Sequence, residues 1–185
     1  MIRMKDVSFR YLNSTEGVSG FGLMVNEGKC VVFTGPSGGG KTTLTRLLNA
    51  LAPSYYTGTL TGTISINGKS LTQMPQYTVA RQIGSVFQDP KSQFFSSELA
   101  GEAAFACENY GFSAEEIRDR TDDAIVSFGL NGFRSRNLDV LSSGEKQKVA
   151  IASVYALRPD IYVCDEPTST LDKTGAETLA AVFKQ

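Results

Sequence analysis

A glycine-rich run that ends in lysine and threonine is the strongest chemical feature of the sequence. The pattern G-x-x-x-x-G-K-[ST] is met without a mismatch by Gly35, Pro36, Ser37, Gly38, Gly39, Gly40, Lys41 and Thr42. Glycines allow the backbone angles that aim successive N–H groups into one concave nest for anions. Lys41 can then reach the β- and γ-phosphates of a nucleotide, and the Thr42 hydroxyl can ligate Mg²⁺. We expect this loop, together with the following Thr43, to bind nucleotide phosphates.

Two adjacent carboxylates, Asp165 and Glu166, follow the apolar run Ile161–Cys164. A strand that ends in acidic residues places them at the carboxyl edge of a parallel sheet, where ligands bind. Asp165 is predicted to face Mg²⁺, mainly through water. Glu166 is the best candidate for polarising an attacking water, because the chain has no histidine. On its own, such a pair is usually a solvated strand end.

A second candidate anion site lies in Leu141-Ser-Ser-Gly-Glu145, directly before a predicted helix. Serine hydroxyls, backbone N–H groups and the helix dipole could act together there on a phosphate. Ser142 or Ser143 could equally be an ordinary helix N-cap.

These residues need strands and helices that bring them together. The apolar run Cys30–Thr34, just before the glycine-rich loop, is predicted to be a strand buried on both faces. Ser113 and Glu116 have capping-box spacing at the start of a helix. Further strands are predicted at 2–11, 21–25, 59–67, 83–87 and 161–164, and helices at 41–51, 113–128, 144–157 and from 171 onward. The pattern indicates a parallel α/β core interrupted by helices at about 90–140.

Composition excludes several classes of function. Among 185 residues, 18 Lys and Arg balance 19 Asp and Glu, which argues against nucleic acid as a partner. The absence of histidine excludes a Ser-His-Asp triad and histidine-bound zinc. We expect no membrane span and no signal peptide. Cys30, Cys107 and Cys164 are expected to be reduced thiols that pack as small buried apolar residues, and none is a candidate nucleophile.

The order of the motifs resembles ATP-binding-cassette (ABC) ATPases over nearly the whole chain. The motifs are GPSGGGKT, Gln88 after a strand, LSSGEKQKVAIAS, IYVCDEP and STLD. The resemblance implies ATP and Mg²⁺ as ligands and a P-loop core with an N-terminal antiparallel β subdomain. It also implies a division into a core of residues 1–89 and 158–185 and a helical subdomain of about 90–157.

The resemblance further assigns roles to single residues. Tyr11 would stack on adenine, although a lone tyrosine there could simply be a strand residue. Gln88 would reach Mg²⁺ and the attacking water. The loop of Ser142, Ser143, Gly144 and Glu145 would complete the site of a second ABC ATPase chain, so that two chains enclose two ATP molecules. Asp172, at the end of Ser169–Asp172, would lie in the segment that crosses this dimer interface.

The chain departs from the family pattern in two respects. The commonest signature is LSGGQ, and here Ser143 replaces a glycine and Glu145 a glutamine. The extra side chain and the extra negative charge are expected to weaken ATP binding modestly. The family also has a histidine on a strand beyond the STLD motif, and the sequence ends in the helix before that strand. We therefore expect an incomplete ABC domain, for which nucleotide binding without turnover is one interpretation.

The segment Val86–Phe95 resembles the ATPase subunits of energy-coupling-factor transporters, which import vitamins and metal ions. This implies integral membrane transport subunits as partners and a cytoplasmic position on the inner face of the membrane. Phe94 and Phe95 could contact such a subunit, or both could belong to the core of the helical region. The alternative is a soluble ABC ATPase of translation or DNA maintenance, against which the absence of a basic arm and of a coiled coil argues.

Overall fold

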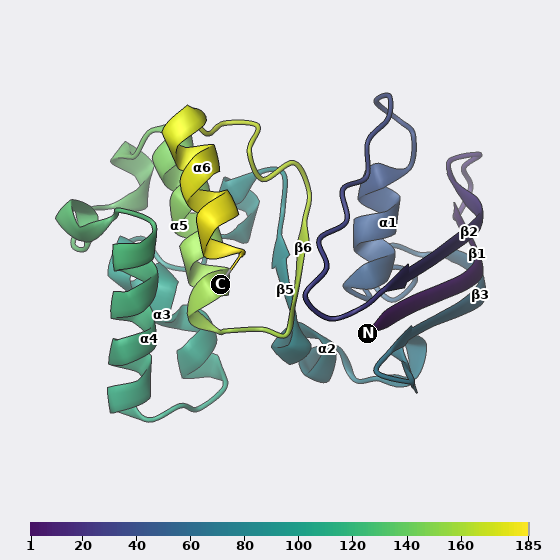
Figure 1. The fold of residues 1–185 in the computed structure, drawn as a ribbon, viewed down its shortest axis with the longest axis horizontal. Coiled ribbons are helices and arrows are strands. Elements are labelled where there is room, and N and C mark those ends of the chain that lie inside the picture. The colour runs from purple at the N-terminus through teal and green to yellow at the C-terminus, as the bar shows by residue number, and fades with distance from the viewer. Residues whose placement is uncertain (185) are drawn as a thin grey trace. The chain divides into compact units, whose positions relative to one another are not determined.

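The computed structural model describes residues 1–184, and these form two compact units, residues 1–83 and the residues from 84 onward (Figure 1). Among the described residues, no helix has both the length and the apolar character needed to cross a membrane.

The first unit is built on an antiparallel sheet in the order β2-β1-β3-β4. Its strands are β1 (Ile2–Tyr11), β2 (Gly17–Val25), β3 (Gly58–Ile66) and β4 (Lys69–Ser70). The register pairs Ile2 with Val25 on one side and with Ile66 on the other. The dipeptide Asn67-Gly68 is a hairpin-type signal in the sequence, and it does connect β3 to β4, with positive φ angles at both residues.

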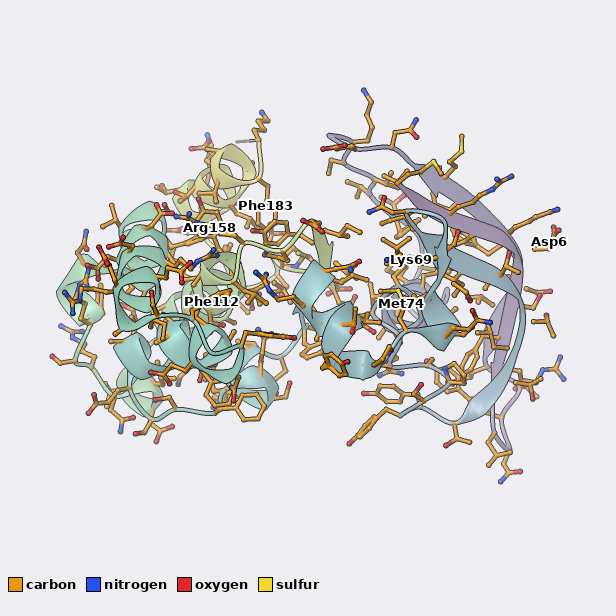
Figure 2. The ribbon with its side chains drawn as sticks, turned by 90° about the horizontal axis from the view of Figure 1, so that it is seen from below. Asp6, Lys69, Met74, Phe112, Arg158 and Phe183 are labelled. Carbon is orange, nitrogen blue, oxygen red and sulfur yellow. The ribbon has the colours of Figure 1, made fainter. Side chains whose placement is uncertain are left out.

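Alternation along β1 decides which face of this sheet is buried. Ile2, Met4, Val7 and Phe9 are buried, and the period of two is interrupted by a bulge at Asp6, which has a φ of 51°. Figure 2 shows Asp6 at the outer side of this sheet. The unit also contains helix α1 (Lys41–Leu48), the short helix α2 (Gln76–Gln82) and a 3₁₀ turn at Leu71–Gln73. The sequence patterns did not predict α2.

One strand prediction in this unit is wrong. Residues 30–34 have no regular secondary structure, and Val32 is 76% exposed. A strand buried on both faces needs neighbouring strands, and residues 30–34 belong to none of the strand pairs described within the first unit. Cys30 is accordingly exposed, contrary to expectation, whereas Cys107 is buried and Cys164 partly buried, and none of these three cysteines forms a disulfide.

The second unit is mainly helical around a two-stranded sheet. It contains all but the first residue of β5 (Ile83–Val86), together with α3 (Leu99–Asn109), α4 (Ala114–Ser127), α5 (Ser143–Ala156), β6 (Ile161–Cys164) and α6 (Lys173–Val182). Short 3₁₀ turns lie at Pro90–Gln93, Asn131–Phe133 and Leu138–Val140. The N–H of Asp165 donates to the carbonyl of Val86 at 2.9 Å, so the carboxyl ends of the two strands meet, as in a parallel pair. The predicted α/β class is therefore confirmed.

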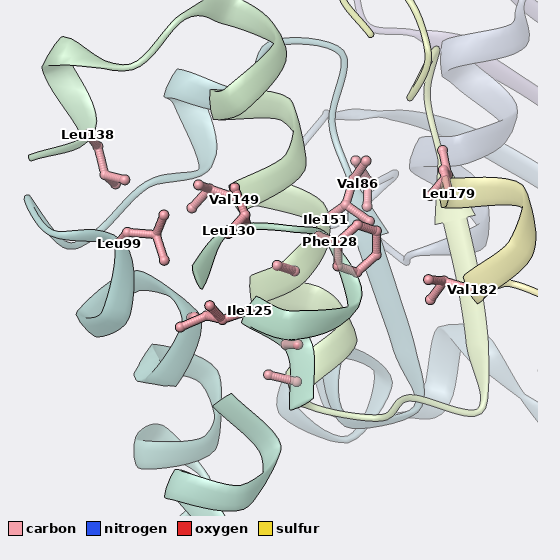
Figure 3. Close-up of a cluster of buried hydrophobic side chains, with 14 of the residues drawn as sticks. Val86, Leu99, Ile125, Phe128, Leu130, Leu138, Val149, Ile151, Leu179 and Val182 are labelled. Atoms are coloured by element: carbon pink, nitrogen blue, oxygen red, sulfur yellow. The ribbon is translucent and has the colours of Figure 1, made fainter. Parts of the chain in front are cut away.

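The core of the second unit gathers apolar side chains from its three long helices (Figure 3). Leu99, Ile125 and Ile151 are fully buried there, one each from α3, α4 and α5. Burial of such side chains is worth about 1.5–3 kcal/mol each. The same core includes Val86 of β5, and Cys164 of β6 packs against it.

Polar contacts also hold α4 in place. Ser113 caps α4 with the predicted capping box. Arg158, seen in Figure 2, donates to Asp123 of α4 at 2.9 Å.

Candidate functional site

The glycine-rich residues 35–42, called the phosphate loop below, connect residues 30–34 to α1. Gly38 and Gly40 have φ angles of 76° and 84°, in the left-handed region that favours glycine. Gly40 is the N-cap of α1, and Lys41 is the first residue of the helix, as predicted. The N–H groups at this helix end point out of the first turn, which is the arrangement that binds phosphate.

Lys41 folds back over the phosphate loop. Its Nζ donates to the carbonyl oxygens of Gly35 and Pro36 at 2.9 and 2.8 Å. An ammonium group has three hydrogens, so one remains for a further acceptor. A cavity of about 610 Å³ adjoins this side chain, lined by Gly17, Val18, Ser19, Phe21, Val32, Phe33, Thr34, Gly39, Lys41 and Leu44. Its size suits a nucleotide-sized ligand.

Gly40 is held to its residue type by both its backbone and its neighbour. A Cβ placed on Gly40 would lie 2.7 Å from Cγ1 of Val18 on β2. We expect Gly40→Ala to destabilise the chain by about 1–3 kcal/mol and to weaken nucleotide binding, because the added methyl adds a clash to a strained φ. Denaturant unfolding and calorimetric titration with ATP would measure both effects. The control is Gly28→Ala, since Gly28 also has positive φ but no atom within 4 Å of the added Cβ; equal losses in both variants would contradict the role given to Val18.

Tyr11 lies at the end of β1, and its hydroxyl contacts two residues of α1. Its Oη is 3.1 Å from Oγ1 of Thr43 and accepts from Nη1 of Arg46 at 2.9 Å. Thr43 is buried, and its hydroxyl forms its hydrogen bond with the Tyr11 hydroxyl. The structure thus places Tyr11 next to the helix that begins with the phosphate loop, and the sequence patterns gave no indication of Arg46.

In the second unit, the structure brings Gln88 and Glu166 together. The hydrogen bond between Asp165 and Val86 aligns the ends of β5 and β6, and Gln88 follows β5 by two residues. Nε2 of Gln88 donates to Oε2 of Glu166 at 3.3 Å. Asp165 is only 8% exposed, whereas Glu166 is exposed. An amide beside an exposed carboxylate can orient and polarise one water molecule.

The signature residues Ser142–Glu145 start α5 with a second capping box. The Ser142 backbone N–H and hydroxyl both donate to the Glu145 carboxylate at 2.7 Å, and the Glu145 N–H donates to the Ser142 hydroxyl at 3.3 Å. The N-cap interpretation of Ser142 is confirmed. Because Ser142 directs its hydrogens to Glu145, the donors left for a phosphate are those of Ser143 and Gly144.

These hydrogen bonds lower the pKa of Glu145 below its ordinary value of 4.5, first through the Ser142 hydroxyl and then through its N–H. A depressed pKa in the folded state adds stability above pH 4.5 that is lost as the pH falls through the lowered value. We expect Glu145→Gln, which can still make a capping box, to destabilise the chain near neutral pH and less so below pH 4.

Unfolding by denaturant at pH 7 and at pH 3.5 would measure the difference in unfolding free energy between the original chain and Glu145→Gln, which should be smaller at pH 3.5. Glu116→Gln removes the corresponding capping-box carboxylate of α4 and controls for a general effect of acid on helix caps. If Glu145→Gln lost the same unfolding free energy at both pH values, the stabilising role given to the charged Glu145 carboxylate would be wrong.

The segment that contains the STLD motif packs against the start of α5. A Cβ on Gly144 would lie 3.1 Å from the carbonyl oxygen of Thr170. Asp172 is the N-cap of α6, and its Oδ1 accepts from the N–H of Gly175 at 2.7 Å. Both segments thus lie side by side on the second unit. Whether Asp172 also faces a second chain stays a prediction.

The donor set fits magnesium better than a transition metal. Among residues 1–184, no group of three or more His, Cys, Asp or Glu side chains could hold a metal ion. Mg²⁺ usually retains several waters and binds through one or two protein oxygens together with substrate phosphates. Oxygens of this kind are offered by the Thr42 hydroxyl in the first unit and by the Gln88 amide and Asp165 carboxylate in the second. Bound Mg²⁺ would neutralise part of the charge of the phosphates.

Comparison with known proteins identifies the family. The sequence model of the ABC transporter family matches residues 18–169. The chain belongs to the ABC transporter family. An ABC transporter ATP-binding protein of Treponema denticola is 40% identical over 186 residues, which cover 100% of this chain and 38% of that protein. A corresponding protein of Methanosarcina acetivorans is 38% identical over 99% of this chain and 30% of its own length. The chain thus spans less than half the length of these ABC relatives.

Solved ABC structures share the fold. The cbiO1 protein of Clostridium perfringens, part of the ABC transporter complex cbiONQ, is 26% identical with a TM-score of 0.81, covering 99% of this chain and 72% of that protein. The dimeric bacterial ABC cassette MJ0796 is 25% identical with a TM-score of 0.85, covering 98% and 81%. MJ0796 was also solved as a dimer in a post-hydrolysis state with ADP and Pi. The predicted family, that of ABC ATP-binding domains, is confirmed.

Proposed function

We propose that this ABC chain binds ATP with Mg²⁺ and hydrolyses it to drive a membrane importer of the energy-coupling-factor type. The hydrogen bond between Gln88 and Glu166 carries the hydrolytic part of this proposal, because it pairs a water-orienting amide with an exposed carboxylate. The phosphate loop supplies the binding part, with Lys41 poised over it. The nucleotide base would lie against Tyr11.

In the proposed reaction, the chain's own residues bind, orient and accept a proton. The phosphate-loop N–H groups and Lys41 would hold the phosphates, and Thr42 and Asp165 are the residues that would hold Mg²⁺, whose charge would offset that of the phosphates. Gln88 orients a water, and Glu166 accepts its proton as the water attacks the γ-phosphorus. The bond to the β–γ bridging oxygen breaks, and ADP leaves with that electron pair. A second ABC chain would complete each site through Ser143 and Gly144, in keeping with the MJ0796 dimer.

An exposed aromatic surface supports a membrane subunit as partner. Phe95 is 74% exposed and stacks on Phe105 with ring centroids 4.6 Å apart, whereas Phe94 packs against the helical core. The two phenylalanines therefore differ, and only Phe95 is available to a partner. The cbiO1 relative is part of the ABC transporter complex cbiONQ, which supports an importer subunit as the partner and a position of this chain on the inner face of a cell membrane.

The nucleotide part is tested by thermal unfolding with and without ATP and Mg²⁺. A ligand that binds only the folded state adds RT ln(1 + [L]/Kd), about 2.7 kcal/mol at 100 times Kd. We expect a raised midpoint at millimolar ATP and a smaller rise with AMP. An unchanged midpoint with ATP would refute the proposal.

The transporter part is tested by co-expression with the integral membrane subunits of an energy-coupling-factor transporter, followed by co-purification. We expect Phe95→Ser to lose the complex and Val126→Ser, on an exposed residue of α4, to retain it. Isolation of the chain on ribosomes or DNA instead would favour the soluble ABC ATPase.

A further inference from the structure

An arginine on α1, the helix that follows the phosphate loop, has no role in the proposed mechanism. Arg46 lies on α1, five residues after Lys41, and its guanidinium is 3.9 Å from the ring centroid of Tyr56. Its Nη1 donates to the hydroxyl of Tyr11 at 2.9 Å. One side chain thus connects the end of β1 with the segment that precedes β3.

The backbone holds these two segments together independently of Arg46. The N–H of Leu12 donates to the carbonyl of Thr57 at 3.0 Å, and Tyr11 pairs with Gly58 across β1 and β3. Tyr56 is therefore held close to Tyr11 by the sheet, and the Arg46 guanidinium stacks on the Tyr56 ring. A planar guanidinium that stacks and donates at once loses little freedom for each contact it makes.

The ring of Tyr11 is restrained at both of its ends. Its inner part packs edge-on against the buried Phe9, with ring centroids 4.9 Å apart and an interplanar angle of 85°. Its hydroxyl is held by Arg46 and by Thr43. Arginine can only donate, so the tyrosyl oxygen accepts from it, and the tyrosyl hydrogen remains for Thr43. The ring, which is only half-buried, is therefore fixed in orientation rather than free to turn about its Cβ.

We propose that Arg46 is a positioning residue for the nucleotide base, which it serves by holding the Tyr11 ring in its base-stacking orientation. The inference rests on the proposed function, since it requires that ATP binds with its base on Tyr11. Because Arg46 and Lys41 belong to one helix, the base and the phosphates are then oriented by the same rigid element. An aromatic ring fixed before binding loses less entropy when a base stacks on it.

The test separates the base from the phosphates by titrating the chain calorimetrically with Mg²⁺ plus either ATP or inorganic tripolyphosphate, which has no base. We expect Arg46→Lys to lower ATP affinity about threefold to tenfold, because lysine keeps the charge but lacks the stacking plane. Tripolyphosphate affinity should stay within about twofold, which also shows that the phosphate loop is folded. Arg3→Lys, on an exposed residue of β1, is the matched control and should change neither affinity.

A double-mutant cycle with Tyr11→Ala tests the route of the effect. We expect Tyr11→Ala to lower ATP affinity about 5- to 100-fold, and Arg46→Lys to add no further loss in that background. A further loss there, equal losses for ATP and tripolyphosphate, or full ATP affinity in Arg46→Lys would each overturn the inference while leaving the proposed ATPase in place. Failure of the unchanged chain to bind ATP would instead overturn the proposed function itself.

Discussion

ATP hydrolysis by the chain is expected to fall at least about 100-fold when Glu166 is replaced by glutamine, while ATP affinity stays within about twofold. Glutamine has the same shape and can still contact Gln88, but it cannot accept the proton of the attacking water. Glu166 is exposed, so the substitution leaves no buried group unpaired. Phosphate release and calorimetric titration would measure rate and affinity on the same preparation.

The control for this prediction is Glu177→Gln on α6. Glu177 is an exposed acid whose described ion pair is a 4.0 Å contact with Lys173, so its replacement removes the same charge outside the site. We expect that variant to hydrolyse ATP at the original rate. Full activity in Glu166→Gln would exclude Glu166 as the proton acceptor and leave the roles of the phosphate loop untouched.

ATP affinity is expected to fall about 100-fold in Lys41→Met, because charge-assisted contacts to phosphate contribute about 1.5–3 kcal/mol. Methionine retains much of the apolar stem but cannot donate to phosphate or to the carbonyls of Gly35 and Pro36. Tripolyphosphate affinity should fall by the same factor as ATP affinity, in contrast to the base-specific effect expected of Arg46→Lys.

Titration with both ligands would measure this, with Lys5→Met, on an exposed residue of β1, as the control for net charge. A Lys41→Met chain that still binds tripolyphosphate at the original affinity would mean that Lys41 does not contact the phosphates. The backbone nest would then be sufficient for binding.

Local patterns predicted the elements of the site closely. The hairpin at Asn67 and Gly68 follows from two residues that tolerate positive φ, and α1 begins at Lys41 as its loop pattern requires. The proximity of Gln88 and Glu166 was implied by family resemblance, and the parallel pairing of β5 with β6 provides its physical basis. Each of these depends on a few residues close in sequence, or on one strand pair.

The failures concern contacts between distant segments. Apolar residues 30–34 favour burial, but their pattern does not supply strand partners, and those residues form no strand pair within the first unit. The contact of Arg46 with Tyr11 joins residues 35 positions apart through a side chain that, on a helix surface, usually faces water. No periodicity in the sequence indicates such a contact. The one available signal is that Arg46 precedes Tyr56 closely in the sequence, because arginine often stacks on tyrosine.

Glu166 has a φ of 49°, a conformation that an L-residue adopts at a cost of roughly 1–2 kcal/mol and that glycine adopts freely. The residue that best suits this backbone is therefore different from the residue that the proposed chemistry needs. Glu166→Gly should raise the unfolding midpoint and abolish hydrolysis in the same molecule. A directed-evolution campaign that selects only for heat resistance would be drawn towards inactive chains at this position, so any such selection should include turnover as a second criterion.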